Sequence, residues 1–129
     1  MPEDPAARAK VQALAHAIAV DIHPICNLKV ANFAASLTST PNESRAAWMR
    51  QFIAPGLSAV ETMLGRYDQT PYCCGDIPGL VDICLIPQLY NADRWGVDIS
   101  HLPRILAVGQ ACANVPAFAD AHPDMCKPD

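Results

Sequence analysis

Apolar residues recur at steps of three and four between residues 11 and 25, which is the spacing of one face of an α-helix. The stripe consists of Val11, Leu14, Ile18, Ile22 and Ile25. Asp4 followed by Pro5 predicts the N-cap and the first position of this helix. Pro24 lies inside the stripe and predicts a kink, because proline lacks the N–H of a helical hydrogen bond. The apolar pattern resumes beyond the kink through Leu28, Val30 and Phe33.

A second long helix is predicted to begin after a loop over residues 36–39. Thr40, Pro41 and Glu43 have the spacing of a capping box, with threonine at the N-cap and glutamate at N3. Apolar residues then repeat near every fourth position, and they are Trp48, Phe52, Val60, Met63 and Tyr67. We interpret them as core residues rather than as a cofactor site, because helical spacing of this kind is typical of a buried face. Residues 55–56, Pro-Gly, predict a bend in this helix.

Residues 80–90 are apolar on almost every face, which is typical of a buried, central helix. Pro87 lies within this segment and predicts a kink or an early end. The segment follows a loop over residues 68–78 and precedes a polar connection over residues 91–102. Two further helices are predicted over residues 103–114 and 116–121. The pattern therefore predicts an all-α fold, a helical bundle around a buried central helix.

Composition narrows the function classes. The 129 residues fit one domain over residues 1–129, since domains commonly have ~100–150 residues. A hydrophobic content of 51% with 17% charged residues excludes wholesale disorder. The net charge of −4, with basic residues scattered singly, argues against a nucleic-acid or anionic-lipid partner. No apolar run approaches the ~20 residues of a membrane helix, and the acidic start is unlike a signal peptide. These features predict a cytoplasmic protein.

No metal site is predicted. The six cysteines have spacings that match neither a CxxC pair nor a zinc site, and we expect all of them to be reduced. His16 and His23 are seven residues apart, which is a rise of about 10 Å along a helix. This separation is too large for both side chains to bind one ion.

Several strings along the chain, taken together and in order, carry a resemblance to a known family. Residues 21–30 read DIHPICNLKV, residues 82–92 read DICLIPQLYNA, and Arg94-Trp95 and Val97-Asp98 follow. His122-Pro123-Asp124 with Pro128-Asp129 forms the tail, and Pro2-Glu3-Asp4-Pro5 opens the chain. This set resembles the C-terminal helical domain of zeta-class glutathione S-transferases, the class that contains maleylacetoacetate and maleylpyruvate isomerases. The thioredoxin-like domain that precedes it in this family is absent from the 129 residues.

The resemblance implies a glutathione-dependent cis–trans isomerase of aromatic catabolism, with glutathione as cofactor and a small maleyl dicarboxylate as substrate. The catalytic residue that activates the thiol is expected in the absent domain, so the isolated chain is expected to be inactive. The full protein is expected to form a homodimer. Loss of the covering domain would expose apolar surface, so the chain alone is expected to self-associate.

The resemblance implies two substrate-binding residues, Arg94 and His23, and helical spacing adds Asn27 as a third candidate. Arg94 stands where the family carries its carboxylate-binding arginine; the alternative is an exposed ion pair with Asp93 or Asp98, worth ~0–1 kcal/mol. His23 is expected near the substrate, or else to stabilise the kink through a hydrogen bond. Asn27 lies four residues further on the same helix face and adds a polar contact or has a structural role.

The start of the buried helix carries the folding motif of the family in altered form. The cap position is Gly79, where the family usually has serine or threonine, and Asp82 remains at N3. We assign both residues to stability rather than to catalysis, because Asp82 can still accept a hydrogen bond from the Gly79 amide.

Two other readings stay open. One is a stand-alone helical module that binds a protein partner, which the absent thioredoxin-like domain favours. The other is a general glutathione transferase that acts on electrophilic aromatic substrates. A pair of residues suited to carboxylates, His23 and Arg94, favours the isomerase over both.

Overall fold

A computed structural model describes residues 1–67 and 71–126. Within this part of the chain all regular structure is helical, and the only strand-like pairing is an isolated bridge between Tyr72 and Gly75. The elements are α1 (Pro5–His16), η1 (Ala17–Ile22), α2 (His23–Ile25), α3 (Leu28–Ser36), α4 (Pro41–Leu64), α5 (Leu80–Arg94), α6 (Pro103–Ala113) and α7 (Pro116–Asp120). The predicted all-α fold is confirmed. Residues 68–70 of the predicted loop and the Pro128-Asp129 end of the tail lie outside the described residues.

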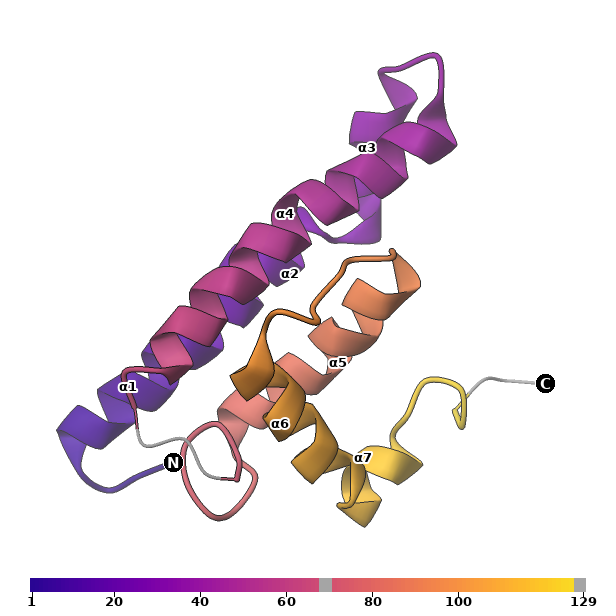
Figure 1. Cartoon of the computed structure of the whole chain (residues 1–129). Helices are drawn as coiled ribbons and strands as arrows, with labels where there is room; N and C mark the ends of the chain where they lie inside the picture. The colour runs from indigo at the N-terminus through magenta and orange to yellow at the C-terminus, as the bar shows by residue number, and fades with distance from the viewer. Residues whose placement is uncertain (68–70, 127–129) are drawn as a thin grey trace.

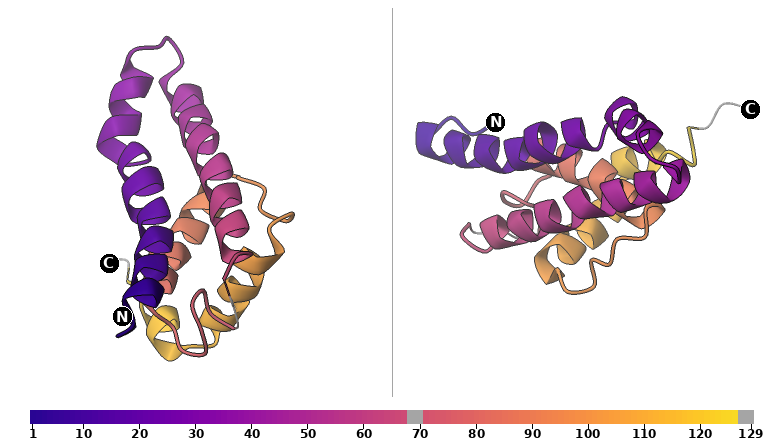
Figure 2. Two further views of the ribbon diagram at one scale, coloured as in Figure 1. Left: turned by 90° about the vertical axis from the view of Figure 1, so that its left-hand side faces the viewer. Right: turned by 90° about the horizontal axis from the view of Figure 1, so that it is seen from above.

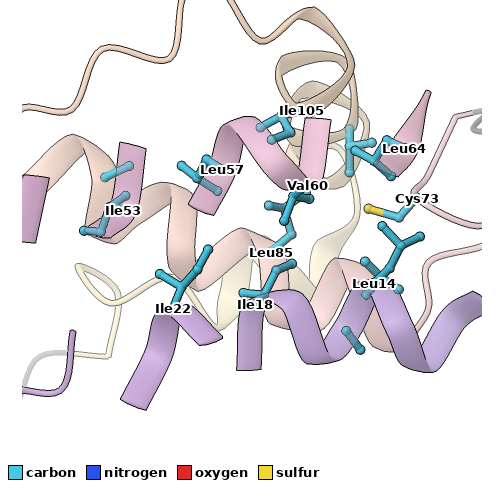
Figure 3. Packing of buried hydrophobic residues seen from close by; sticks show 14 of the residues in the cluster. Leu14, Ile18, Ile22, Ile53, Leu57, Val60, Leu64, Cys73, Leu85 and Ile105 are labelled. Carbon is cyan, nitrogen blue, oxygen red and sulfur yellow. The ribbon is translucent and has the colours of Figure 1, made fainter. Parts of the chain in front are cut away.

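Two long antiparallel arms form one side of the molecule (Figures 1 and 2). The first arm runs through α1, η1, α2 and α3, and the second is α4, which packs along α3 and η1. Helix α5 packs against α1, η1 and α6 and thus lies centrally, as predicted. Side chains from η1, α4, α5 and α6 meet in one core, among them Ile18, Val60, Leu85 and Ile105 (Figure 3).

The start of the first arm agrees with the sequence. Asp4 is the N-cap of α1 and its Oδ2 accepts a hydrogen bond of 2.7 Å from Ala7 N, with Pro5 at N1. The predicted kink takes the form of the π-helical turn η1 directly before α2. A π-helical turn fits here because Pro24 has no N–H with which to continue the α-helical ladder. The first arm then breaks between Cys26 and Asn27.

The apolar residues that continue the pattern in α3 are not its buried face. Leu28, Val30 and Phe33 are 52%, 40% and 68% exposed, whereas Ala31 and Ala35 form the buried face. The break at residues 26–27 restarts the helix with a new rotation, so the stripe of α1 does not continue. Small alanines then let α3 lie closely against α4.

Helix α4 begins at Pro41 after Thr40, as predicted, but the capping box is not formed, because the Thr40 side chain makes no cap hydrogen bond. Thr38 Oγ1 instead lies 2.8 Å from Ser44 Oγ. The helix continues through Pro55 to Leu64, and its fully buried residues are Met49, Ile53, Leu57, Val60 and Leu64. Of the predicted core set, Trp48, Phe52, Met63 and Tyr67 flank this face and pack against it half-buried.

Helix α5 begins at the predicted cap. Gly79 is its N-cap, and Asp82, which is 1% exposed, accepts from Gly79 N at 2.7 Å and from Cys73 N at 2.9 Å. The helix passes Pro87 and reaches Arg94, so the first residues of the predicted polar connection are helical. Burial is one-sided: Val81, Leu85, Gln88 and Ala92 face the core, whereas Ile83 is 60% exposed. The apolar residues on its second face are therefore not explained by this core.

Helix α6 receives its cap from another helix. Its N-cap residue Leu102 has no side-chain acceptor, and the carboxylate of Glu61 on α4 accepts from Arg104 N at 3.1 Å and Ile105 N at 2.9 Å. Glu61 is 8% exposed. No helix of the described residues is long and apolar enough to cross a membrane. All six cysteines are free thiols.

Candidate functional site

The break between α2 and α3 is held by side chains. Asn27 is the N-cap of α3, and its Oδ1 accepts a hydrogen bond of 2.9 Å from Lys29 N. Because the Lys29 amide is thereby turned toward Asn27, the carbonyl of Ile25 needs a different donor. Trp48 Nε1 on α4 provides it, at 2.9 Å. The prediction that Asn27 lies on the same helix face as His23 is therefore wrong, because the helix ends at Ile25 and Asn27 caps the next one.

His23 opens α2 directly after the π-helical turn and is partly buried. Burial lowers the pKa of its imidazole below the ordinary 6.5, so the ring is neutral near pH 7. Within residues 1–67 and 71–126 the ring makes no hydrogen bond, so the alternative reading, a bond that stabilises the kink, is not observed there. A neutral imidazole carries one N–H donor and one acceptor nitrogen.

Arg94 is the last residue of α5, and its side chain is exposed. Its guanidinium lies over the ring of Trp95, 5.8 Å from the centroid. The alternative ion pair with Asp93 or Asp98 is not among the salt bridges of the described residues. Asp98 instead accepts from Ser100 N at 2.9 Å, a hydrogen bond that lowers the pKa of this carboxyl group.

The α2–α3 break and the end of α5 both hydrogen-bond to side chains of α4. Trp48 donates to Ile25 O at the α2–α3 break, and Arg50 Nε donates to Trp95 O at 2.7 Å at the end of α5. These two donors are separated by a single residue of α4. The structure therefore anchors the elements that carry His23 and Arg94 to the same short stretch of helix.

The remaining candidates are separate from this region or structural. Gly79 and Asp82 form the start of α5, at the end opposite Arg94. His16 is exposed at the end of α1. Among the residues that the structure describes, no group of three or more His, Cys, Asp or Glu side chains could hold a metal ion.

The open face of α5 forms an apolar cleft that the sequence reading missed. Its volume is about 710 Å³, and it lies between α5, α6, α7 and the segment after α7. Its apolar walls include Ile83, Ile86, Pro87, Leu89, Val115 and Phe118. Asp93 and His122 supply the polar groups at its edge, and the rings of His122 and Tyr90 are 5.4 Å apart. The apolar second face of α5 is the signal of this cleft in the sequence, but the pattern alone predicts full burial of that face.

Comparison with known proteins identifies the relatives of the chain, although no protein-family model matches it. It is 43% identical over 128 residues to a maleylacetoacetate isomerase of Rhizobium meliloti, covering 99% of this chain and 60% of that protein. The holo structure of a zeta-class maleylpyruvate isomerase superposes with a TM-score of 0.93 at 35% identity, over 100% of this chain and 61% of the other. The chain is homologous to the C-terminal part of zeta-class glutathione transferases.

A second solved structure of this family contains ligands. The maleylacetoacetate isomerase of Anaeromyxobacter dehalogenans, with dicarboxyethyl glutathione and citrate bound in its active site, is 38% identical with a TM-score of 0.90. The match covers 99% of this chain and 56% of that one. The chain thus spans little more than half the length of these zeta-class relatives.

Proposed function

We propose that this chain is the substrate-binding, helical half of a glutathione-dependent maleyl cis–trans isomerase that acts in the cytoplasm. The observation that carries the proposal is Arg94 at the end of α5, which is exposed and in no ion pair among residues 1–67 and 71–126. The carbonyl of the next residue, Trp95, and the α2–α3 break after His23 hydrogen-bond to the same stretch of α4. Homology to maleylacetoacetate and maleylpyruvate isomerases supports it.

The substrate of such a reaction is a dianion, and the residues of this chain are suited to its carboxylates. Arg94 presents a planar fork of donors, which binds a carboxylate through two parallel hydrogen bonds. His23, neutral because burial lowers its pKa, donates one N–H to a carboxylate without adding a second charge. The NH2 group of Asn27, at the start of α3, adds a weaker contact. Glutathione, when bound, supplies the thiolate that adds reversibly to the conjugated double bond and so permits rotation.

The apolar cleft on α5 is the surface on which we place the thioredoxin-like half of the enzyme. It is about 710 Å³ in volume, and the zeta-class relatives extend well beyond the part that this chain matches. In the 129-residue chain alone this surface is uncovered, so we expect self-association at high concentration and no turnover. The complete protein is expected to be a homodimer.

The test joins the chain to the part of the Rhizobium meliloti relative that precedes the match. We expect isomerisation of maleylacetoacetate or maleylpyruvate by the joined protein in the presence of glutathione, and none by the 129-residue chain. Calorimetry should show glutathione binding to the chain alone no tighter than millimolar. Submillimolar binding, or a joined protein that folds but is inactive beside an active Rhizobium enzyme, would contradict the proposal.

Arg94→Ala in the joined protein tests the carboxylate contact. A lost charged hydrogen bond of ~1.5–3 kcal/mol predicts at least a tenfold lower kcat/KM. Arg8→Ala is the matched control, because in the described part of the chain Arg8 donates to the backbone oxygens of Pro2 and Glu3, just before α1. Equal kinetics in the Arg94 variant and the control would remove Arg94 from the site.

The apolar cleft also favours a second candidate function, a helical module that binds a protein partner. The two functions differ in what they require of Arg94. A binding module would tolerate Arg94→Ala and lose its partner on Ile83→Asp in the cleft, whereas the isomerase would lose activity through both changes.

A further inference from the structure

We propose that Arg50 is a positioning residue that holds Arg94 in place for carboxylate binding. The inference rests on the proposed function, in which Arg94 is the carboxylate contact. Arg50 lies on α4, 45 residues before Trp95 in the sequence, and its Nε donates to Trp95 O at 2.7 Å. The bond therefore joins α4 to the residue that directly follows Arg94.

The end of α5 explains why this bond matters. The last carbonyls of a helix have no partner within the helix. Here Gly96, with φ +65°, lets the chain turn back, and its amide donates to Asp93 O at 3.0 Å. Val97 N donates to Ala92 O at 2.9 Å, which completes a Schellman motif. Trp95 O lies outside that motif, and Arg50 from α4 provides its hydrogen bond.

The turn after α5, over residues 95–97, also supports the side chain of Arg94. Trp95 Nε1 donates to Asn91 Oδ1 at 3.0 Å, which fixes the orientation of the indole ring. The guanidinium of Arg94 lies over this ring, 5.8 Å from its centroid. Arg50 thus fixes the backbone of Trp95, and Arg94 lies over the Trp95 ring. Without Arg50, the exposed Arg94 side chain would sample many rotamers before it could bind a carboxylate.

The experiment uses the 129-residue chain with nitrogen-15 label, and maleate as the probe because it is a cis dicarboxylate. Arg50→Gln removes the bond to Trp95 O, and Arg50→Lys is a second variant that keeps the charge and a shorter donor. Arg8→Gln is the control, since Arg8 also donates to backbone oxygens but at the start of the chain. The readouts are the heteronuclear NOE of the Arg94 Nε–Hε group and the maleate dissociation constant.

In the wild-type chain we expect a higher heteronuclear NOE for the Arg94 Nε–Hε group than for that of Arg66, which is exposed. In Arg50→Gln the NOE of Arg94 should fall to the value of Arg66. Maleate affinity should fall about three- to tenfold, with Arg50→Lys intermediate and Arg8→Gln unchanged. In an Arg94→Gln background, Arg50→Gln should have no further effect on maleate affinity, because a positioning residue acts through Arg94.

Three distinct results would overturn either the role of Arg50 or the proposed function on which it rests. Unchanged order of Arg94 in Arg50→Gln would remove the positioning role. Additive losses in the double variant would show that Arg50 itself contacts the dicarboxylate. Maleate binding that is absent from the wild-type chain, or that survives Arg94→Gln, would count against the proposed function, while the order of Arg94 would still decide the role of Arg50.

Discussion

Replacing Glu61 by alanine tests whether one helix caps another in this fold. Glu61 lies on α4 and is 8% exposed. Its Oε2 accepts from Ile105 N at 2.9 Å, and its Oε1 accepts from Arg104 N and Arg104 Nη1, both at 3.1 Å. Alanine would leave two amides at the start of α6 without an acceptor, and the Ile105 amide is in a buried position.

The magnitude follows from these contacts. Loss of a side-chain N-cap costs typically ~1 kcal/mol, and a hydrogen bond to a charged group contributes ~1.5–3 kcal/mol. The Arg104 side chain is 49% exposed, so its ion pair with Glu61 adds only ~0–1 kcal/mol. We therefore expect Glu61→Ala to lower the free energy of unfolding by about 3 kcal/mol. For a chain of this size the corresponding fall in Tm is about 10 °C.

Urea unfolding followed by far-UV circular dichroism measures this difference. Arg104→Ala removes the ion pair but keeps both backbone hydrogen bonds, so it should cost less than about 1 kcal/mol. Glu43→Ala, in the first turn of the same helix, controls for loss of an acidic residue and should cost at most about 1 kcal/mol. If Arg104→Ala destabilised the chain as much as Glu61→Ala, the ion pair rather than the cap would be the stabilising contact.

Three further predictions concern single positions. Gly79→Ser should raise the free energy of unfolding measured in urea by a few tenths of a kcal/mol, since a serine side chain can cap α5; a clear loss would show that the cap is misplaced. Gly56→Ala should lower Tm, because the new Cβ would lie 2.6 Å from Ile22 Cγ1. Gly109→Ala is the control and should be close to neutral, because its Cβ would meet the flexible end of Leu89 at 3.2 Å. Burial lowers the pKa of His23, so the unfolded chain gains a proton first as pH falls through 6.5. The free energy of unfolding should therefore fall from pH 7.5 to 5.5, and it should fall less in His23→Gln. An NMR titration midpoint of His23 at or above 6.5 would show that burial does not lower its pKa.

Local signals in the sequence predicted several elements of the fold correctly. Asp4 caps α1 and Gly79 begins α5 because each cap depends on residues within the next three positions. The buried stripe of α1 and η1 was equally visible, since helical spacing alone sets which side chains share a face. Thr40 shows the limit of such patterns, because its side chain makes no cap bond although its spacing fits.

Tertiary packing decided what local spacing could not. Leu28, Val30 and Phe33 repeat like core residues, but the break at residues 26–27 turned α3 so that its alanines face α4. The second face of α5 reads as core in the sequence, yet the chain leaves it open as an apolar cleft.

The candidate site shows the same division. The sequence by itself determined the family strings around His23 and Arg94, because they are contiguous and in order. It could not show that Trp48 and Arg50 anchor these two strings to one turn of α4, since their hydrogen bonds span 23 and 45 residues. Bonds of that span form only when helices pack, and the same packing brings Glu61 to the start of α6 across 44 residues. Only the tertiary structure therefore assigned these polar side chains their partners.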